Sequence, residues 1–253
     1  MAYRIFCFVK FFEKEEWADD FMQGKLYCNT LQFFSELEQK EDGRGDPYEG
    51  AAALLQPHGT VIKFSFNNDK MKDFTLDPND VVGPIVIHSS ENLAHNVYCL
   101  YAIYIDDSFE EFSDDELTEE ELAKRVASVS NKLKLHEDCY RMGTHAVLIY
   151  AVEPFIEALK LYEKNNNIRL RRGLVRYYDE IVFNGDFKEQ EAIFHKQKKF
   201  SHQKEYRIAF CSAAQSAFTI DIGSIENYAK KMPVNDIRQL SITVAPREKS
   251  TPT

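Results

Sequence analysis

The alternation of apolar and polar residues along the chain predicts many short strands and fewer helices. Apolar or alternating runs predict strands at 3–12, 25–29, 51–55, 61–66, 84–88, 97–105, 146–152, 174–183, 205–211 and 237–244. Helical spacing of apolar residues predicts helices at 13–23, 31–40, 118–134, 153–164, 186–198 and 224–231. Strands outnumber helices and do not alternate with them regularly. We therefore expect an α+β fold, with a mostly antiparallel sheet, whole or split, and flanking helices.

One acidic segment interrupts this pattern. The stretch 106–121 holds ten carboxylates and no basic residue, and Thr118 with Glu121 forms a capping box for the helix that follows. The chain shows neither an internal repeat nor a long linker. We expect a single α+β domain over 1–253, in which the acidic loop plus helix at 106–135 is a candidate insertion.

Composition places the chain among folded, reduced proteins. Of its 253 residues, 44% are hydrophobic and 28% are charged, which is close to the average of globular domains. The five cysteines are scattered and never spaced as C-x-x-C, so neither a disulfide framework nor a zinc site is indicated. No apolar run approaches the roughly 18 residues that cross a bilayer. These features predict a cytoplasmic protein with no membrane association.

The charge is unevenly distributed. Thirty-one Lys and Arg against 41 Asp and Glu give a net charge of −10, which argues against general affinity for nucleic acid. The span 160–207 nevertheless holds twelve basic and seven acidic residues. A basic face there could collect a nucleotide-type small molecule, or a protein or nucleic-acid acceptor; the alternative is an ordinary solvated face.

Two polar groups stand out near the start of the chain. Arg4 lies in an otherwise apolar strand, where it must either form an internal salt bridge or hold an anionic ligand. Asn29 and Thr30 end the next strand. They could offer polar groups to a ligand, or Thr30 could cap the following helix.

Two further groups lie later in the chain. The loop RGDPYEG carries Arg44, Asp46 and Glu49 between glycines, which indicates either ligand binding or an internal lock of the loop. Glu205 and Arg207 lie on one face of a strand that follows a basic segment, where they could serve a ligand or a cross-strand ion pair. No known phosphate-binding or metal-binding signature is present, and we expect no metal.

These groups, in this order, resemble the DUF2971 family of bacterial and phage proteins. The similarity rests on Tyr3-Arg4, on GKLYCN at 24–29, on GDPYE at 45–49, and on Lys196 followed by KEYR at 204–207. The layout is also similar to that of ADP-ribosyltransferases. That resemblance implies that Arg4 holds the pyrophosphate of NAD, that Asn29 or Thr30 orients either the catalytic glutamate or the nicotinamide ribose, and that Glu205 is the catalytic carboxylate.

The resemblance therefore implies an NAD-using ADP-ribosyltransferase or NAD glycohydrolase, acting as a toxin or defence effector between phage and bacterium. Two alternatives stay open. One is a non-catalytic module that binds a nucleotide or a protein through the 160–207 region, the 44–50 loop and Arg207. The other is a Mg²⁺-dependent nuclease that uses Asp46, Glu49 and Glu205. The enzyme hypothesis requires Arg4 and Glu205 to face one shared cavity.

Overall fold

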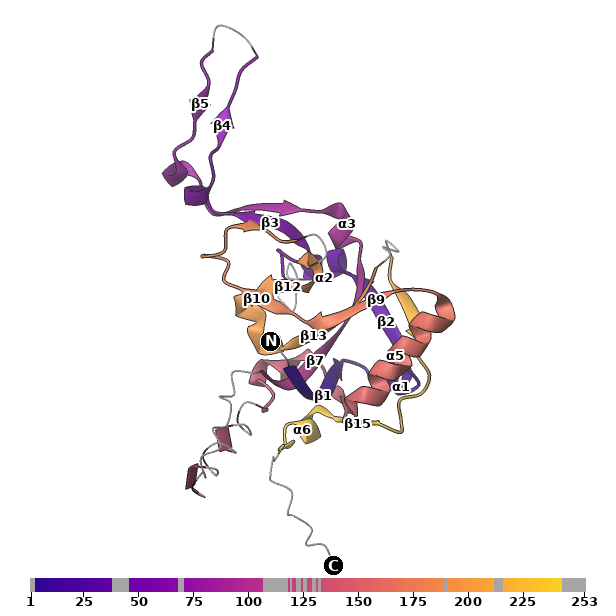
Figure 1. Ribbon diagram of the computed structural model, residues 1–253. Coiled ribbons are helices and arrows are strands. Elements are labelled where there is room, and N and C mark those ends of the chain that lie inside the picture. Colours follow the sequence, from indigo (N-terminus) through magenta and orange to yellow (C-terminus); the bar gives the residue numbers. More distant parts are fainter. Residues whose placement is uncertain are drawn as a thin grey trace, which may run out of the picture. The chain divides into compact units, whose positions relative to one another are not determined.

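The computed structural model of the chain has an α+β fold with mostly antiparallel strand pairing, which confirms the predicted fold class (Figure 1). The residues that it describes are 3–37, 46–67, 71–106, 118, 120–121, 124, 127–128, 131, 133–188, 191–211 and 216–242. Among these residues, no helix is long and apolar enough to cross a membrane.

The chain divides into two compact units, each made of separate stretches of sequence. Unit 1 takes the described residues of Met1–Leu26, Leu100–Asn165 and Asp221–Thr253, and unit 2 takes those of Tyr27–Cys99 and Asn166–Ile220. The division falls inside two strands, β2 (Lys25–Thr30) and β7 (Asn96–Asp106). The single domain expected from the sequence stays a prediction.

Unit 1 is organised around its first strand. Its elements are β1 (Tyr3–Phe12), α1 (Glu15–Met22), η4 (Glu137–Met142), β8 (His145–Ile149), α5 (Val152–Asn166), β15 (Ala229–Pro233) and α6 (Val234–Ile237). Strand β1 pairs antiparallel with the second half of β7 on one side and with β8 on the other, and β15 pairs with β8. Cys7, Phe8 and Val9 are all buried, so β1 is covered on both faces, as its continuous apolar run predicts.

A glycine ends helix α1. Gly24 has φ +88°, and a Cβ atom there would lie 2.0 Å from the carbonyl oxygen of Gly223. The left-handed conformation and the close backbone contact both require glycine at this position. The chain can therefore turn directly from α1 into β2.

Unit 2 consists of short strands and turns. Its elements are α2 (Leu31–Leu37), β3 (Ala51–Leu55), η2 (Pro57–Gly59), β4 (Lys63–Phe64), β5 (Phe74–Thr75), η3 (Pro78–Asp80), β6 (Ile85–His88), α3 (Ser90–Leu93), β9 (Leu170–Leu174), β10 (Arg176–Tyr178), β11 (Gly185–Asp186), η5 (Ala192–Phe194), β12 (His195–Gln197), η6 (Lys198–Gln203), β13 (Glu205–Phe210) and β14 (Phe218–Asp221). Strands β9 and β13 pair antiparallel, β3 pairs with both β6 and β11, and β10 pairs with β12 in parallel.

Several predicted elements are wrong. Residues 186–198 do not form a helix, because Ala192, Ile193 and Phe194 are buried in succession and β12 then pairs with β10. The predicted strand over 174–183 is correct only in part: β9 ends at Leu174, β10 occupies Arg176–Tyr178, and a turn follows at 180–182. Residues 224–231 are not helical but lead into β15. At the predicted strand 237–244, Ile237 ends α6 and the described residues 238–242 are not a strand. In each case tertiary pairing overrides the local pattern.

The predicted insertion lies largely outside the described residues, as does most of the helix expected over 118–134. The capping box predicted at the start of the helix over 118–134 is confirmed. Thr118 N donates to Glu121 Oε2 at 3.0 Å, and Glu121 N donates to Thr118 Oγ1 at 3.3 Å.

Candidate functional site

Four charged residues of unit 2 form a buried group, which we call the ion cluster: Glu49, Lys196, Glu205 and Arg207. Glu49 lies in the turn before β3, Lys196 in β12, and Glu205 and Arg207 in β13. No more than 5% of any of these residues is exposed. Because burial of an unpaired charge is costly, such a group is stable only if its charges meet one another.

Arg207 lies at the centre of the ion cluster. Its Nη1 donates to Glu49 Oε1 at 2.7 Å, and its Nε donates to Glu205 Oε1 at 2.7 Å. Nη1 also donates to the backbone carbonyl of Ile193, in η5. Glu205 and Arg207 share one face of β13, as strand alternation predicts for positions two apart.

Lys196 closes the other side of the ion cluster. Its Nζ donates to Glu205 Oε2 at 3.3 Å and to Gln203 Oε1 at 2.9 Å, and lies 3.7 Å from Glu49 Oε2. Each glutamate thus faces both cations. Two positive and two negative charges cancel within the group.

The electrostatic balance favours the charged forms of Glu205 and Lys196. Burial by itself raises the pKa of Glu205, but Arg207 and Lys196 outweigh it and lower that pKa to about 2. Burial likewise depresses the pKa of Lys196, yet Glu205 and Glu49 hold it above its usual value. The ion cluster therefore contains an ionised carboxylate whose oxygens are already occupied by protein cations.

Asp46 attaches the preceding loop to β12. Its Oδ1 accepts from Tyr48 N and its Oδ2 accepts from Gln197 N, both at 2.9 Å. Burial, and then repulsion from Glu49, raise the pKa of this carboxyl to about 6, although the two backbone bonds and Lys196 act in the opposite direction. Asp46 is thus a buried acid that titrates near neutral pH.

The other predicted site residues lie elsewhere. Arg4 is exposed on β1 and belongs to unit 1, whereas the ion cluster belongs to unit 2. Asn29 Oδ1 accepts from Thr30 N at 2.9 Å, and Thr30 Oγ1 accepts from Phe33 N at 3.2 Å, so Thr30 caps α2. Arg44 lies outside the described residues. Of the residues proposed from the sequence, Asp46, Glu49, Glu205 and Arg207 come together.

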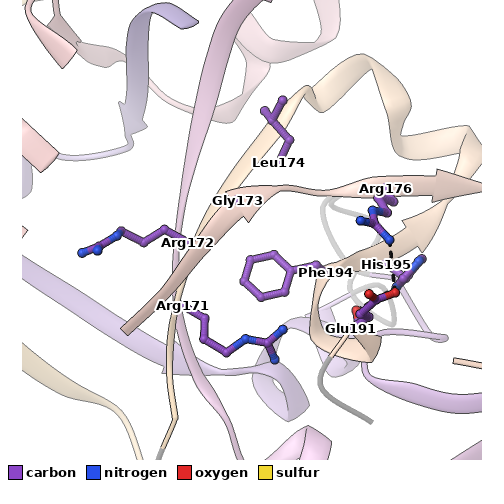
Figure 2. Close-up of a pocket in the computed structure, with 8 residues that line it drawn as sticks. All are labelled: Arg171, Arg172, Gly173, Leu174, Arg176, Glu191, Phe194 and His195. Carbon is purple, nitrogen blue, oxygen red and sulfur yellow. Dashed lines mark hydrogen bonds and ion pairs between the residues drawn. The ribbon is translucent and has the colours of Figure 1, made fainter. Parts of the chain in front are cut away.

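A second group of charged side chains lines a cavity of about 180 Å³ in unit 2 (Figure 2). We call it the arginine pocket, and its lining residues are Arg171, Arg172, Gly173, Leu174, Arg176, Glu191, Phe194 and His195. They come from β9, from the start of β10, from η5 with Glu191 just before it, and from the first residue of β12. Three arginines and one glutamate give this lining a positive balance.

The side chains of the arginine pocket gather around Phe194. Figure 2 shows Arg171 reaching toward the ring, with its guanidinium carbon 5.4 Å from the ring centroid, while Arg172 extends away from it. A Cβ atom on Gly173 would lie 3.9 Å from the ring, so glycine leaves that side of the ring uncovered. Arg176 Nη1 donates to Glu191 Oε2 at 3.1 Å.

His195 adds a titratable group to the lining of the arginine pocket. Its Nδ1 donates to the carbonyl oxygen of Glu191 at 2.7 Å, so Nε2 is the unprotonated nitrogen of the neutral ring. Burial is the main cause that lowers the pKa of His195, and Arg176 and Arg207 lower it further. The imidazole is therefore neutral at neutral pH and gains its charge on acidification.

The ion cluster holds one wall of the arginine pocket. Arg207 binds the carbonyl of Ile193, the residue before Phe194, and Lys196 follows His195 in β12. The basic span 160–207 indicated this region in the sequence, but none of the lining residues stood out individually, and the predicted helix over 186–198 hid the wall formed by Glu191, Phe194 and His195. The signal that could have found it is the density of Arg at 169–176, close in sequence to a second basic stretch at 195–199.

No family model, curated protein or solved structure matches the chain. The resemblance to the DUF2971 family stays a prediction. Among the described residues, no three His, Cys, Asp or Glu side chains form a group that could hold a metal ion.

Proposed function

We propose that the protein is a binding module for a phosphate-bearing ligand of nucleotide type, which the arginine pocket recognises by its phosphates. The single observation that carries this proposal is the lining of the cavity. Three arginines and one glutamate line it, in a chain whose net charge is −10. A local positive surface on an acidic protein attracts anions to that place rather than to the surface at large.

The residue type supports phosphate as the ligand group. A guanidinium is planar and can donate two parallel hydrogen bonds to phosphate oxygens. Arg176 is accessible for such a contact, since 65% of its side chain is exposed. Glu191 holds Arg176 in place before a ligand arrives.

The size of the cavity limits what enters it. Pockets that enclose a whole small ligand measure roughly 300–1,000 Å³. A cavity of about 180 Å³ is suited to a phosphate or pyrophosphate group. The nucleoside part of the ligand would then lie outside the cavity, along the surface of unit 2.

Titration calorimetry with pyrophosphate, AMP and ADP tests this proposal. Arg171→Ala and Arg176→Ala should each weaken binding by at least about tenfold, because each removes a charge-assisted hydrogen bond. Arg169→Ala is the matched control. It removes the same charge from an exposed residue outside the lining, and should change the dissociation constant little. Equal losses in all three variants would contradict a specific pocket.

The NAD hypothesis makes a separate prediction. An ionised carboxylate at the start of β13 is the group that would stabilise an oxocarbenium ion, but it would have to leave Lys196 and Arg207 first. If Glu205 is catalytic, wild-type protein consumes NAD and Glu205→Gln does not. Pyrophosphate binding without NAD loss would favour the binding module. Activity that chelator abolishes and Mg²⁺ restores would instead favour the nuclease alternative.

A further inference from the structure

Cations continue the lining of the arginine pocket on both sides, and we call the whole series the basic strip. Its members are Arg169, Arg171, Arg172, Arg176 and Lys198. The carbonyl oxygen of Arg169 accepts from Cys211 N at 3.1 Å, which extends the pairing of β9 with β13 by one residue. Arg169 and Arg171 are two positions apart on this extended chain, so they share one face at a separation of roughly 7 Å. The positive charge therefore reaches beyond the pocket at the start of β9.

At its other end the basic strip follows β10. Arg176 opens this strand and lies opposite His195 in the parallel pairing with β12. Lys198 comes directly after β12, and its Nζ lies 3.5 Å from Asp179 Oδ2. Asp179 is three residues beyond Arg176, a distance of roughly 10 Å along an extended chain. The basic strip thus passes from the start of β9, across the pocket, to the end of β10.

The charges of the basic strip are accessible to a partner. The side chains of Arg176 and Lys198 are 65% and 67% exposed. Their ion pairs with Glu191 and Asp179 are partly exposed too, and such pairs are weak enough for an anion to compete with them.

The basic strip also differs in sign from the chain as a whole. Residues 169–176 hold four arginines and no acidic residue, and 195–199 hold three lysines and no acidic residue. The net charge of the chain is −10. A polyanion is therefore repelled by most of the protein and attracted to this one region.

The position of β9 in the sheet gives the arginines a common margin. In the described part of the chain β9 pairs with β13 alone, so it is an edge strand. Figure 2 shows Arg171 reaching toward Phe194 and Arg172 extending away from it. Charged residues on an edge strand help to prevent pairing with other chains, but that role can be filled by charges of either sign. A series of arginines without any acidic residue indicates an anionic partner in addition.

We propose that the ligand of the arginine pocket is a single-stranded nucleic acid. One of its phosphates enters the cavity, and the neighbouring phosphates lie along the basic strip. This inference rests on the proposed function and adds the class of ligand to it. A mononucleotide would use the pocket alone, whereas a strand also uses the cations on either side of it.

The shape of the basic strip favours a linear ligand. From Arg169 to Arg176 the chain spans up to roughly 23 Å, which is far longer than one phosphate group. Guanidinium groups donate paired hydrogen bonds to phosphate oxygens, and a flexible single strand can follow such a series of cations along its backbone. A duplex holds its phosphates on two stiff backbones and fits a single series of cations less well.

Fluorescence anisotropy with a labelled single strand of thymidines tests the proposal. A length of about twelve nucleotides lies within the range that one binding domain of this kind covers. We expect a dissociation constant of about 1–100 µM, as for binding that depends on phosphates rather than on sequence. The logarithm of the affinity should fall against the logarithm of the salt concentration by about 0.7 for each phosphate contact, or by roughly 3 for four contacts.

A double substitution separates the basic strip from the pocket. Arg169→Ala with Lys198→Ala removes a cation at each end and leaves the pocket lining intact. The affinity for the single strand should fall at least about fivefold, and the salt slope should shrink by about 1.4, because two phosphate contacts are lost. Pyrophosphate binding, measured by titration calorimetry, should be unchanged. Arg141→Ala with Lys160→Ala is the matched control, since it removes an exposed arginine and an exposed lysine from unit 1 and should alter neither ligand.

Failure of this inference can be told apart from failure of the proposed function. If pyrophosphate binds and the single strand does not, the pocket proposal stands and the strand is excluded. If neither binds, both proposals fail. A single strand that binds the double variant as tightly as wild type would also overturn the inference. So would tighter binding of a duplex, of an acidic peptide, or of inorganic polyphosphate with the same number of phosphates.

Discussion

The ion cluster and the arginine pocket are both built around cationic side chains, but the two regions differ in burial and in the number of carboxylates beside those cations. Arg207 and Lys196 face two buried glutamates, and their charges cancel inside the protein. Three arginines of the pocket line a cavity with one glutamate, and Arg176 stays largely in water. Both regions contain arginine. Burial and the local ratio of carboxylates to cations distinguish Arg207 in the ion cluster from Arg176 in the pocket.

The free-energy cost of burying an unpaired charge explains why the two regions differ in their charge balance. A charge in a dry interior must be balanced by an opposite charge, and in the ion cluster Arg207 and Lys196 lie against Glu49 and Glu205. A charge at the surface is stabilised by water and tolerates an imbalance, which a bound anion can then neutralise. Glu205 and the arginines of the pocket thus lie in different electrostatic environments, although both come from one stretch of basic sequence.

The largest expected effect comes from breaking the ion cluster. Arg207→Met leaves Glu49 and Glu205 buried with only Lys196 nearby and removes the bond to Ile193. We expect the free energy of unfolding to fall by about 3–5 kcal/mol, measured by urea denaturation. Arg176→Met is the matched control. Its ion pair is exposed, and exposed pairs contribute at most about 1 kcal/mol. Similar losses in both variants would remove the distinction between the two regions.

The pH dependence of stability should show two opposing limbs. The folded pKa of Glu205 is about 2, below that of the unfolded chain, so its ionisation adds stability that is lost as pH falls below about 4. The folded pKa of Asp46 is about 6, above its unfolded value, so the folded state holds its proton more tightly. Stability from this group is present at low pH and is lost as pH rises from about 4 to 6.

Each limb amounts to about 3 kcal/mol at most, from 1.4 kcal/mol per pKa unit. Urea denaturation between pH 2 and 8 measures both. In Asp46→Asn the limb between pH 4 and 6 should disappear, while the acid limb remains. A wild-type profile that rises steadily from pH 4 to 7 would contradict the assignment of Asp46 as a buried acid.

Removing the one carboxylate of the arginine pocket tests how far the charge of the lining controls anion binding. Glu191→Gln releases Arg176 from its ion pair and raises the charge of the lining by one. We expect pyrophosphate to bind roughly three- to tenfold more tightly, the equivalent of about 1 kcal/mol for a partly exposed charge. Titration calorimetry measures the change, and Glu163→Gln on α5 removes a carboxylate that does not line the pocket. An equal gain in both variants would indicate a general charge effect.

Local pattern was sufficient for much of the fold. The apolar run of β1 and the capping box at Thr118 follow from residues adjacent in sequence, and the mostly antiparallel pairing follows from the irregular order of the predicted strands and helices. The pattern failed at 186–198, where a helix was predicted but Lys196 is in fact held by distant partners. Lys196 is buried because Glu49 and Glu205 surround it, and neither partner is visible in its own segment. Non-local ion pairs leave no periodic signal.

The candidate site was only partly predictable for the same reason. Strand alternation places Glu205 and Arg207 on one face, and the loop with Asp46 and Glu49 was recognised as rich in ionisable groups. That the two meet each other depends on a contact between residues 158 positions apart. The direction of each side chain, inward to a cluster or outward to a pocket, is a property of the folded chain alone.

The smallest expected effect concerns His195, which lies between the two regions. Its pKa is lowered mainly by burial, so it gains a proton only as pH falls below its usual range. Protonation adds a positive charge to the wall of the arginine pocket, and anion binding should therefore tighten on acidification. Sulfate, which stays doubly charged across this range, is a suitable probe. Its dissociation constant should fall by roughly two- to threefold between pH 7.5 and 5.5, because a partly solvated charge adds well under 1 kcal/mol. In His195→Gln this change should vanish. If the variant keeps it, the pH response arises from another group, and the histidine belongs with the structural charges of the ion cluster rather than with the pocket.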